Sequence, residues 1–263
     1  MGIYLLSGIV EYFMNRGCDF KKMIDKEIFM LNEYDLKRYL RDEFVKIFPD
    51  AEFDDSENYL FIRNGGKVLV VSHLDVKYEW SRSREGNTDI KILENGRMES
   101  INGIGGDDRA GVQVMYWMAR LGCKVEYLFT LGEENRCIGA KEFGRKYDNR
   151  SLDYYAMIEF DRRGCDFVLY QYEDESWEEY IRSITGREKG EGRGSDIKYL
   201  DGLGIMGVNL GVGYFNEHGG ESEYVDIDLM VKALRDGLKL IEDLERSGKK
   251  WLFSRYSGRN TPE

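Results

Sequence analysis

The sequence predicts an α/β fold with a mixed, mostly parallel central sheet and helices on both of its faces. Short apolar strand patterns alternate along the chain with longer amphipathic helix patterns, as in α/β proteins. Several strand patterns are apolar without a break, which is typical of parallel strands that are buried on both faces. The length of 263 residues is sufficient for one such domain with a full core.

The first half of the chain predicts helices and strands in turn. Asp35 can cap a helix because its side chain can accept N–H groups of the first turn. Asn95-Gly96 is a strong hairpin signal, since both residues tolerate the backbone of a tight hairpin turn. The predicted elements are a helix from Asp35 to about Phe48, strands at Tyr59–Arg63 and Lys67–Ser72 around the turn Asn64-Gly65-Gly66, strands at Asp89–Leu93 and Arg97–Ser100, a helix at 109–121 and a buried strand at Lys124–Thr130.

The second half continues the alternation and ends in a long amphipathic helix. Asp226 or Asp228 can begin this helix, which runs to about Glu245 with an apolar face turned inward. The elements before it are a helix at Ile138–Lys146, strands at Tyr154–Phe160 and Phe167–Tyr172, a helix from Ser176 to about Ile184, a charged loop at Glu188–Gly194, a short helix capped by Ser195 or Asp196, and a strand at Ile205–Gly211.

Composition narrows the classes of function. The net charge of −11 argues against a nucleic-acid partner, because phosphate binding needs clustered lysines and arginines. The four cysteines form no Cys-x-x-Cys pair, so we expect reduced thiols and no thiolate zinc site. No apolar run approaches the roughly 18 residues of a membrane span, and the N-terminus lacks a basic region and a cleavage site. We therefore expect a cytoplasmic protein without a membrane partner.

The two histidines and several acidic residues follow predicted strands. In parallel sheets, sites form at the carboxyl ends of the strands, which lie at one edge. His73 ends one strand, Glu133 and Glu134 follow the next, Asp161 follows the third and His218 lies beyond the fourth. Two imidazoles, three carboxylates and a spare carboxylate form the set that a hydrolase with two metal ions needs.

Each of these motifs also has a plain structural interpretation. His73 and Asp75 would then be a satisfied buried histidine beside a solvated aspartate. Asp107 and Asp108 lie between two glycines and a helix, where acidic residues often cap the first turn.

The later motifs leave similar alternatives open. Glu133-Glu134 is also typical of a solvated acidic turn, because the chain holds 49 acidic residues. Asp161 is followed by two arginines, either of which could pair with it. His218 lies in a polar, glycine-bounded loop, where a surface histidine is common.

Taken together and in this order, the motifs resemble the co-catalytic zinc exopeptidases (clan MH). That family includes bacterial leucyl aminopeptidase, peptidase T, the glutamyl and tetrahedral aminopeptidases and related amidohydrolases. The resemblance covers about residues 60–245. It rests on His73-Leu-Asp75, Gly106-Asp107-Asp108-Arg109-Ala110-Gly111, Glu133-Glu134, Asp161-Arg-Arg-Gly164, Arg193-Gly194-Ser195-Asp196 and His218.

The resemblance implies a zinc-dependent exopeptidase, similar to an aminopeptidase, that cleaves small peptides with a hydroxide held between two metal ions. It implies two Zn²⁺ ions, with Co²⁺ or Mn²⁺ as alternatives, since nitrogen and oxygen donors of this kind accept all three. It also implies a cis peptide bond between Asp107 and Asp108. The implied roles are a bridge between the metals for Asp107, one site completed by His73 and Asp161, the other by Glu134 and His218, general base for Glu133, and positioning of His73 for Asp75.

The layout of the chain is compact. Relatives insert a lid or dimerisation domain between successive metal ligands, but no interval between the ligands here is long enough for one. We therefore expect residues 1–263 to form a single catalytic domain, with 1–33 as an N-terminal extension packed on it and 246–263 as a C-terminal tail. This layout leaves an oligomer open.

Two other functions stay open. An amidohydrolase or deacylase would use the same site on a non-peptide amide. A metal-binding or peptide-binding module would keep the fold without turnover, although the presence of Glu133 argues against this. For an enzyme, the expected partner is a small peptide or amide.

Overall fold

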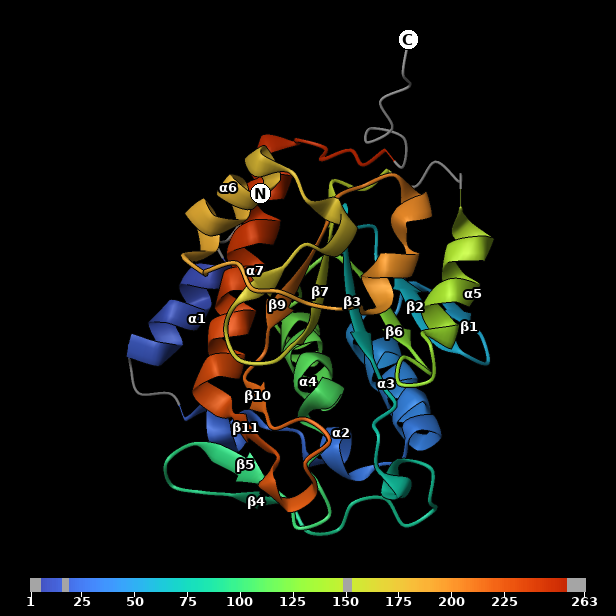
Figure 1. Cartoon of the computed structure of the whole chain (residues 1–263), viewed down its shortest axis with the longest axis vertical. Helices are drawn as coiled ribbons and strands as arrows, with labels where there is room; N and C mark the ends of the chain where they lie inside the picture. Colours follow the sequence, from blue (N-terminus) through green and yellow to red (C-terminus); the bar gives the residue numbers. More distant parts are fainter. Residues whose placement is uncertain (1–5, 16–18, 149–152, 255–263) are drawn as a thin grey trace.

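Figure 1 shows the computed structural model, which describes residues 6–15, 19–148 and 153–254. A seven-stranded sheet runs through the centre of the molecule in the order β1-β2-β6-β3-β7-β9-β8. Its strands are β1 (Glu52–Asp55), β2 (Tyr59–Arg63), β3 (Val68–His73), β6 (Glu126–Thr130), β7 (Ala156–Arg162), β8 (Phe167–Val168) and β9 (Gly207–Gly211).

The centre of this sheet is parallel and its margins are antiparallel. β3 pairs in parallel with β6 and β7, and β7 pairs in parallel with β9. β2 and β8 run antiparallel to their neighbours. The prediction of a mixed, mostly parallel sheet is therefore confirmed. The carboxyl ends of β3, β6 and β7 lie at the same edge, which is where the candidate site residues follow.

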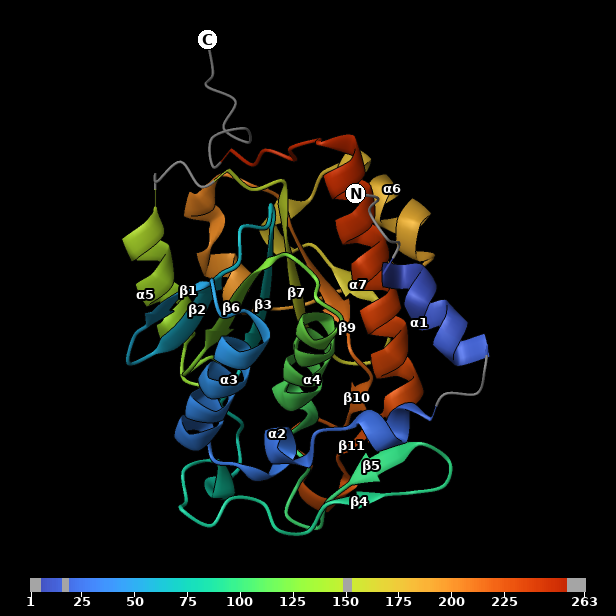
Figure 2. The same ribbon diagram turned by 180° about the vertical axis from the view of Figure 1, so that it is seen from behind.

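Helices cover both faces of the sheet. Figure 2 shows α3 (Glu33–Ile47), α4 (Gly106–Arg120) and α7 (Ile227–Ser247) side by side on one face. The other face carries α5 (Ile138–Tyr147) and the short helices η4 (Asp196–Tyr199) and η5 (Asp201–Leu203), which contact one another. α6 (Glu175–Thr185) packs against α7. None of the helices in the described ranges is long and apolar enough to cross a membrane.

A second, four-stranded sheet lies beyond the carboxyl ends of β3 and β7, at the lower end of Figure 1. Its order is β10-β11-β5-β4, and β10 and β11 contact α4. The hairpin predicted at Asn95-Gly96 is confirmed by the antiparallel pairing of β4 with β5. The strands are β4 (Lys91–Ile92), β5 (Arg97–Glu99), β10 (Tyr214–Phe215) and β11 (Tyr224–Asp226).

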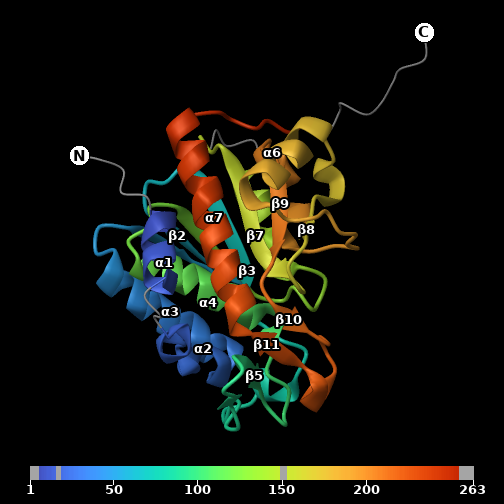
Figure 3. The same ribbon diagram turned by 90° about the vertical axis from the view of Figure 1, so that its left-hand side faces the viewer.

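The N-terminal segment is helical where it is described. α1 (Leu6–Asn15) lies beside α7, as Figure 3 shows, and is followed by the short helices η1 (Phe20–Met23) and α2 (Lys26–Met30). A further 3₁₀ turn, η2 (Glu79–Ser81), follows β3. Side chains on one face of α4 hold the backbone of the N-terminal segment. Trp117 donates to the carbonyl of Met23, Gln113 accepts the N–H of Asp25, and Arg109 donates to the carbonyl of Ile28.

Several predicted boundaries are wrong, each for a local reason. Asn32, and not Asp35, caps α3, because its side chain accepts the N–H groups of Tyr34 and Asp35 one turn earlier. Asp174, and not Ser176, caps α6 in the same way.

Two further differences concern strands. The predicted strand Phe167–Tyr172 ends at Val168, because Tyr170 has a left-handed φ of 50° and begins a short 3₁₀ helix, η3 (Tyr170–Tyr172). β2 and β3 flank the predicted turn but do not pair, since β6 lies between them.

Candidate metal centre

His73 ends β3 with both ring nitrogens facing oxygen acceptors. Its Nδ1 lies 2.9 Å from the main-chain oxygen of Asp75. Its Nε2 lies 3.1 Å from Oδ1 of Asp107 and 3.6 Å from Oδ1 of Asp161. A neutral imidazole has only one N–H, so a proton on Nδ1 leaves the Nε2 lone pair directed at two carboxylates. A cation between these groups would satisfy all three.

Asp107 lies between the two imidazoles. Its Oδ1 faces His73, while its Oδ2 lies 3.6 Å from Nε2 of His218. Glu134 forms a second group of donors with Asp107 and His218, because its Oε1 lies 2.5 Å from the same His218 nitrogen. One carboxylate thus presents one oxygen to each histidine, which is the arrangement that a bridging ligand requires. The peptide bond between Asp107 and Asp108 is cis, as the resemblance implies.

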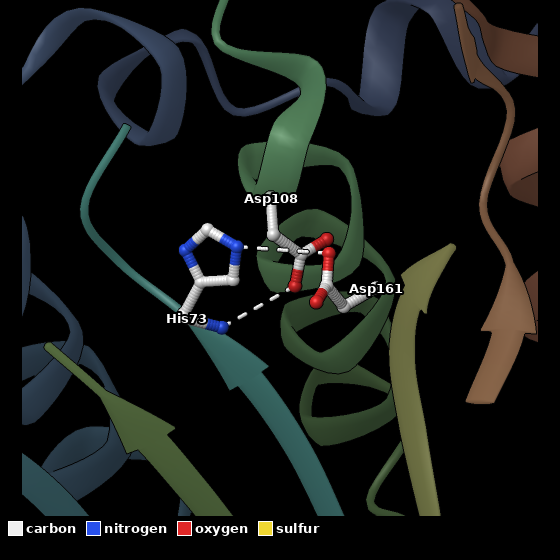
Figure 4. A group of neighbouring side chains, drawn as sticks. All are labelled: His73, Asp108 and Asp161. Carbon is white, nitrogen blue, oxygen red and sulfur yellow. Dashed lines mark hydrogen bonds and ion pairs between the residues drawn. The ribbon is translucent and has the colours of Figure 1, made fainter. Parts of the chain in front are cut away.

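Asp108 lies in the same cluster, although the sequence did not single it out as a ligand. Figure 4 shows its carboxylate beside His73 and Asp161, and the donor atoms of the three lie within 4.8 Å of one another. Its oxygens, however, already accept hydrogen bonds from the Ser72 hydroxyl and the backbone N–H groups of His73 and Gly111. These bonds make Asp108 an anchor of the α4 start, and they leave Asp107 as the better bridging candidate.

Glu133 and Glu134 diverge at the end of the turn that follows β6. Glu134 reaches His218, whereas Oε2 of Glu133 lies 3.9 Å from Nε2 of His73. Asp75 fixes this turn, because its carboxylate accepts the N–H groups of Gly132, Glu133 and Glu134 at 2.8, 3.1 and 3.2 Å. Adjacent side chains therefore serve different parts of the site.

Asp161 is held at the end of β7 by residues that the sequence motifs do not all include. The Ser195 hydroxyl donates to its Oδ2 at 2.7 Å, and the Tyr214 hydroxyl lies 3.4 Å from its Oδ1. Asn209 accepts the N–H of Asp161 and donates to its carbonyl oxygen. A signal for Asn209 was present, since it is a polar residue within the apolar strand β9.

The two arginines after Asp161 have other partners. Arg162 pairs with Asp166 at 2.9 Å, and Arg163 pairs with Glu217 at 3.2 Å. The simple ion-pair interpretation of Asp161 is therefore wrong, and its carboxylate stays directed at His73.

Burial raises the pKa values of two carboxyls in this cluster. Burial, together with Asp161, raises the pKa of Asp107 to about 7. Burial also raises the pKa of Glu133 to about 9, although His73 opposes this shift. Burial alone would favour a neutral imidazole, but Asp161 and Asp107 raise the pKa of His73 well above its usual value. Divalent ions bound beside these carboxyls would lower their pKa values.

The donor geometry fits two metal ions. Two ligands bonded to one tetrahedral zinc ion at about 2.1 Å lie roughly 3.4 Å apart. The separations of His73 from Asp107 and from Asp161, at 3.1 and 3.6 Å, and of Asp107 from His218, at 3.6 Å, agree with that value. Glu134 and His218 lie closer, at 2.5 Å, which is a hydrogen-bond distance. Imidazole nitrogens and carboxylate oxygens are donors that zinc, cobalt and manganese accept.

Comparison with known proteins shows which known fold this chain has. No family model matches the sequence, and no curated protein matches it either. Among solved structures, a tripeptidase from Staphylococcus aureus is 14% identical with a TM-score of 0.66, and the match covers 84% of this chain and 96% of that one.

Two further solved structures extend this comparison. The aminopeptidase PepT from Bacillus cereus is 15% identical with a TM-score of 0.61, over 82% of this chain and 95% of that one. A glutaminyl cyclase from Porphyromonas gingivalis is 13% identical with a TM-score of 0.52, over 78% and 89%. At these identities the likeness establishes the fold: the chain has the α/β fold of aminopeptidase-type hydrolases.

Proposed function

We propose that this chain is a metal-dependent exopeptidase, similar to an aminopeptidase, that releases residues from small peptides. The observation that carries the proposal is the position of Asp107, with one carboxylate oxygen directed at His73 and the other at His218. The fold shared with aminopeptidases supports the same reaction class.

The proposal assigns the metal ligands to two groups that share Asp107. His73 and Asp161 would hold one ion, and Glu134 and His218 would hold the other. Two divalent ions at these positions would polarise the scissile carbonyl and lower the pKa of an attacking water.

Glu133 is the proposed general base. It lies 3.9 Å from His73 but belongs to neither donor group, so its carboxylate is free to accept a proton from the attacking water. It then returns that proton to the nitrogen of the leaving amine. Positive charge at the two sites would lower its raised pKa, which suits it to this exchange.

The variant Glu133→Gln tests this role because it removes the base and keeps the size of the side chain. We expect turnover of small peptides to fall by about 10²- to 10⁴-fold. The bound metal per chain should equal that of the wild type. Glu142→Gln is the matched control, since Glu142 lies on α5, outside the cluster, and its carboxylate accepts hydrogen bonds from Ser56 and Asn58. Retained turnover in Glu133→Gln would exclude Glu133 as the base.

A second candidate is cyclisation of N-terminal glutamine, because one structural neighbour is a glutaminyl cyclase. In that reaction the substrate's own amine attacks its side-chain amide carbon, and Glu133 would carry the amine proton to the departing ammonia. A panel of dipeptides, N-acyl amino acids and a peptide with N-terminal glutamine separates the candidates. Turnover of the acyl compounds alone would indicate a deacylase, and binding without any turnover would indicate a binding module.

A further inference from the structure

Glu223 lies beside the proposed metal centre without belonging to either donor group. Its side chain is fully buried, just before β11. Its Oε2 accepts the N–H of Gly105 at 2.9 Å, and its Oε1 accepts the N–H of Asp107 at 3.5 Å. Glu223 belongs to the same loop as His218, so one carboxylate joins the loop of His218 to the loop of Asp107.

Tyr78 extends this connection. Its hydroxyl accepts the N–H of Gly220 at 3.1 Å and lies beside the Glu223 carboxylate. Its ring is fixed by close packing: a Cβ added at Gly103 would lie only 2.3 Å from the ring. The ring also stacks on Trp80, with the centroids 6.3 Å apart. A rigid side chain therefore holds the turn that directly follows His218.

His218 needs such support more than the other candidate ligands do. Its side chain is 37% exposed, whereas that of His73 is 1% exposed, so packing restrains it much less. Its backbone also has a left-handed φ of 63°, which is uncommon for a residue other than glycine.

We propose that Glu223 and Tyr78 are positioning residues that hold Asp107 and His218 at the separation that a shared metal site requires. This inference rests on the proposed function only in taking Asp107 and His218 as metal ligands. Partners of this kind orient ligands before the ion binds, and their loss weakens metal affinity. Glu223 reaches Asp107 through its backbone N–H, and Tyr78 reaches the loop of His218 through the backbone N–H of Gly220.

Glu126 provides a matched comparison. It is also a buried glutamate, and its Oε1 accepts the N–H of Gly65 at 3.0 Å. It begins β6, at the end of the sheet away from the candidate metal centre. A glutamine at either position loses one acceptor for backbone N–H groups, but only Glu223→Gln does so beside Asp107.

The experiment measures Zn²⁺ affinity and stoichiometry by competition with a chromophoric chelator, and records the absorption spectrum of the Co²⁺-loaded protein. We expect Glu223→Gln to weaken binding of one ion by about 10- to 100-fold. Tyr78→Phe, which removes only a hydroxyl, should weaken the same ion by about tenfold. The Co²⁺ spectrum should change in both variants. The control variants Glu126→Gln and Tyr180→Phe should behave as the wild type. The Tyr180 hydroxyl joins α6 to α7 by donating to Asp243.

The outcomes separate this inference from the proposed function. Wild-type affinity and an unchanged Co²⁺ spectrum in Tyr78→Phe would overturn the inference, even if Glu223→Gln failed to fold. Equal losses in the control variants would overturn it as well. A wild-type protein that binds two ions but turns over no substrate would instead contradict the proposed function, and the affinity measurements would still test the inference.

Discussion

The carboxylate of Asp75 is bonded to the backbone of Glu133, with Oδ1 of Asp75 3.1 Å from the Glu133 nitrogen. The same carboxylate lies 3.6 Å from Nδ1 of His73, whose closer partner is the main-chain oxygen of Asp75 at 2.9 Å. Asp75 therefore supports the histidine mainly through its backbone and the glutamate turn through its side chain. One residue sets the relative position of a proposed ligand and the proposed base.

Asp75→Asn should reduce turnover by about 10- to 100-fold, because an amide NH₂ would oppose backbone N–H donors that the carboxylate now accepts. The effect should lie mainly in kcat, since the displaced group is the proposed base Glu133. Steady-state kinetics and metal content together check this. Asp174→Asn is the control, because Asp174 also accepts a backbone N–H, that of Trp177, but does so at the start of α6. An unchanged kcat in Asp75→Asn would contradict the assignment.

Variants of single ligands should divide the bound metal into two sites. Asp161→Asn and Glu134→Gln should each retain about one ion per chain, whereas Asp107→Ala should retain neither, because both groups share Asp107. Elemental analysis after dialysis against buffer with limiting Zn²⁺ measures this. Asp166→Asn should keep the wild-type content, since Asp166 pairs with Arg162 and faces no histidine in the described residues. Two ions retained by Asp107→Ala would refute the bridging role.

The order of the motifs along the chain correctly predicted at which edge of the sheet much of the candidate site lies. Parallel strands end at one edge, so His73, Glu133 and Asp161 were expected to meet once β3, β6 and β7 were recognised as buried strands. Their approach in the structure follows from that topology. The fold was predictable for the same reason, because uninterrupted apolar strands imply a covered parallel sheet.

The partners that hold these residues were harder to predict, because they come from distant segments. Glu223 contacts Asp107 across more than a hundred residues, and no local pattern distinguishes it from Glu221. Asp108 resembles Asp107 in sequence, and only the hydrogen bonds to Ser72 and Gly111 separate their roles. One helix cap was also wrongly predicted, because Asn32 and Asp35 are both good caps and it is the Asn32 side chain that accepts the first N–H groups of α3.

Trp117→Phe should destabilise the protein by about 1–2 kcal/mol, because it leaves the carbonyl of Met23 without its donor and removes buried volume. The loss should loosen the N-terminal segment on α4, which limited proteolysis within 19–32 would detect. Trp251→Phe is the control, since Trp251 is also buried but its Nε1 has no hydrogen-bond partner among the described residues. Urea denaturation compares the two variants. Equal losses of stability without new cleavage would show that the Trp117 hydrogen bond does not hold the N-terminal segment on α4.

Glu126, at the end of the sheet away from the candidate metal centre, should make the stability of the protein depend on pH. Burial raises its pKa from 4.5 to about 7. The folded protein thus binds a proton that the unfolded chain releases, so this contribution to stability is complete below about pH 4.5 and is lost as pH rises through about 7. Glu126→Gln removes the ionisation and keeps an acceptor for Gly65. Relative to the wild type, the variant should therefore gain about 1–3 kcal/mol between about pH 5 and about pH 8. Urea denaturation at both pH values measures this gain, and a difference between the two proteins that does not change with pH would show that Glu126 is ionised throughout.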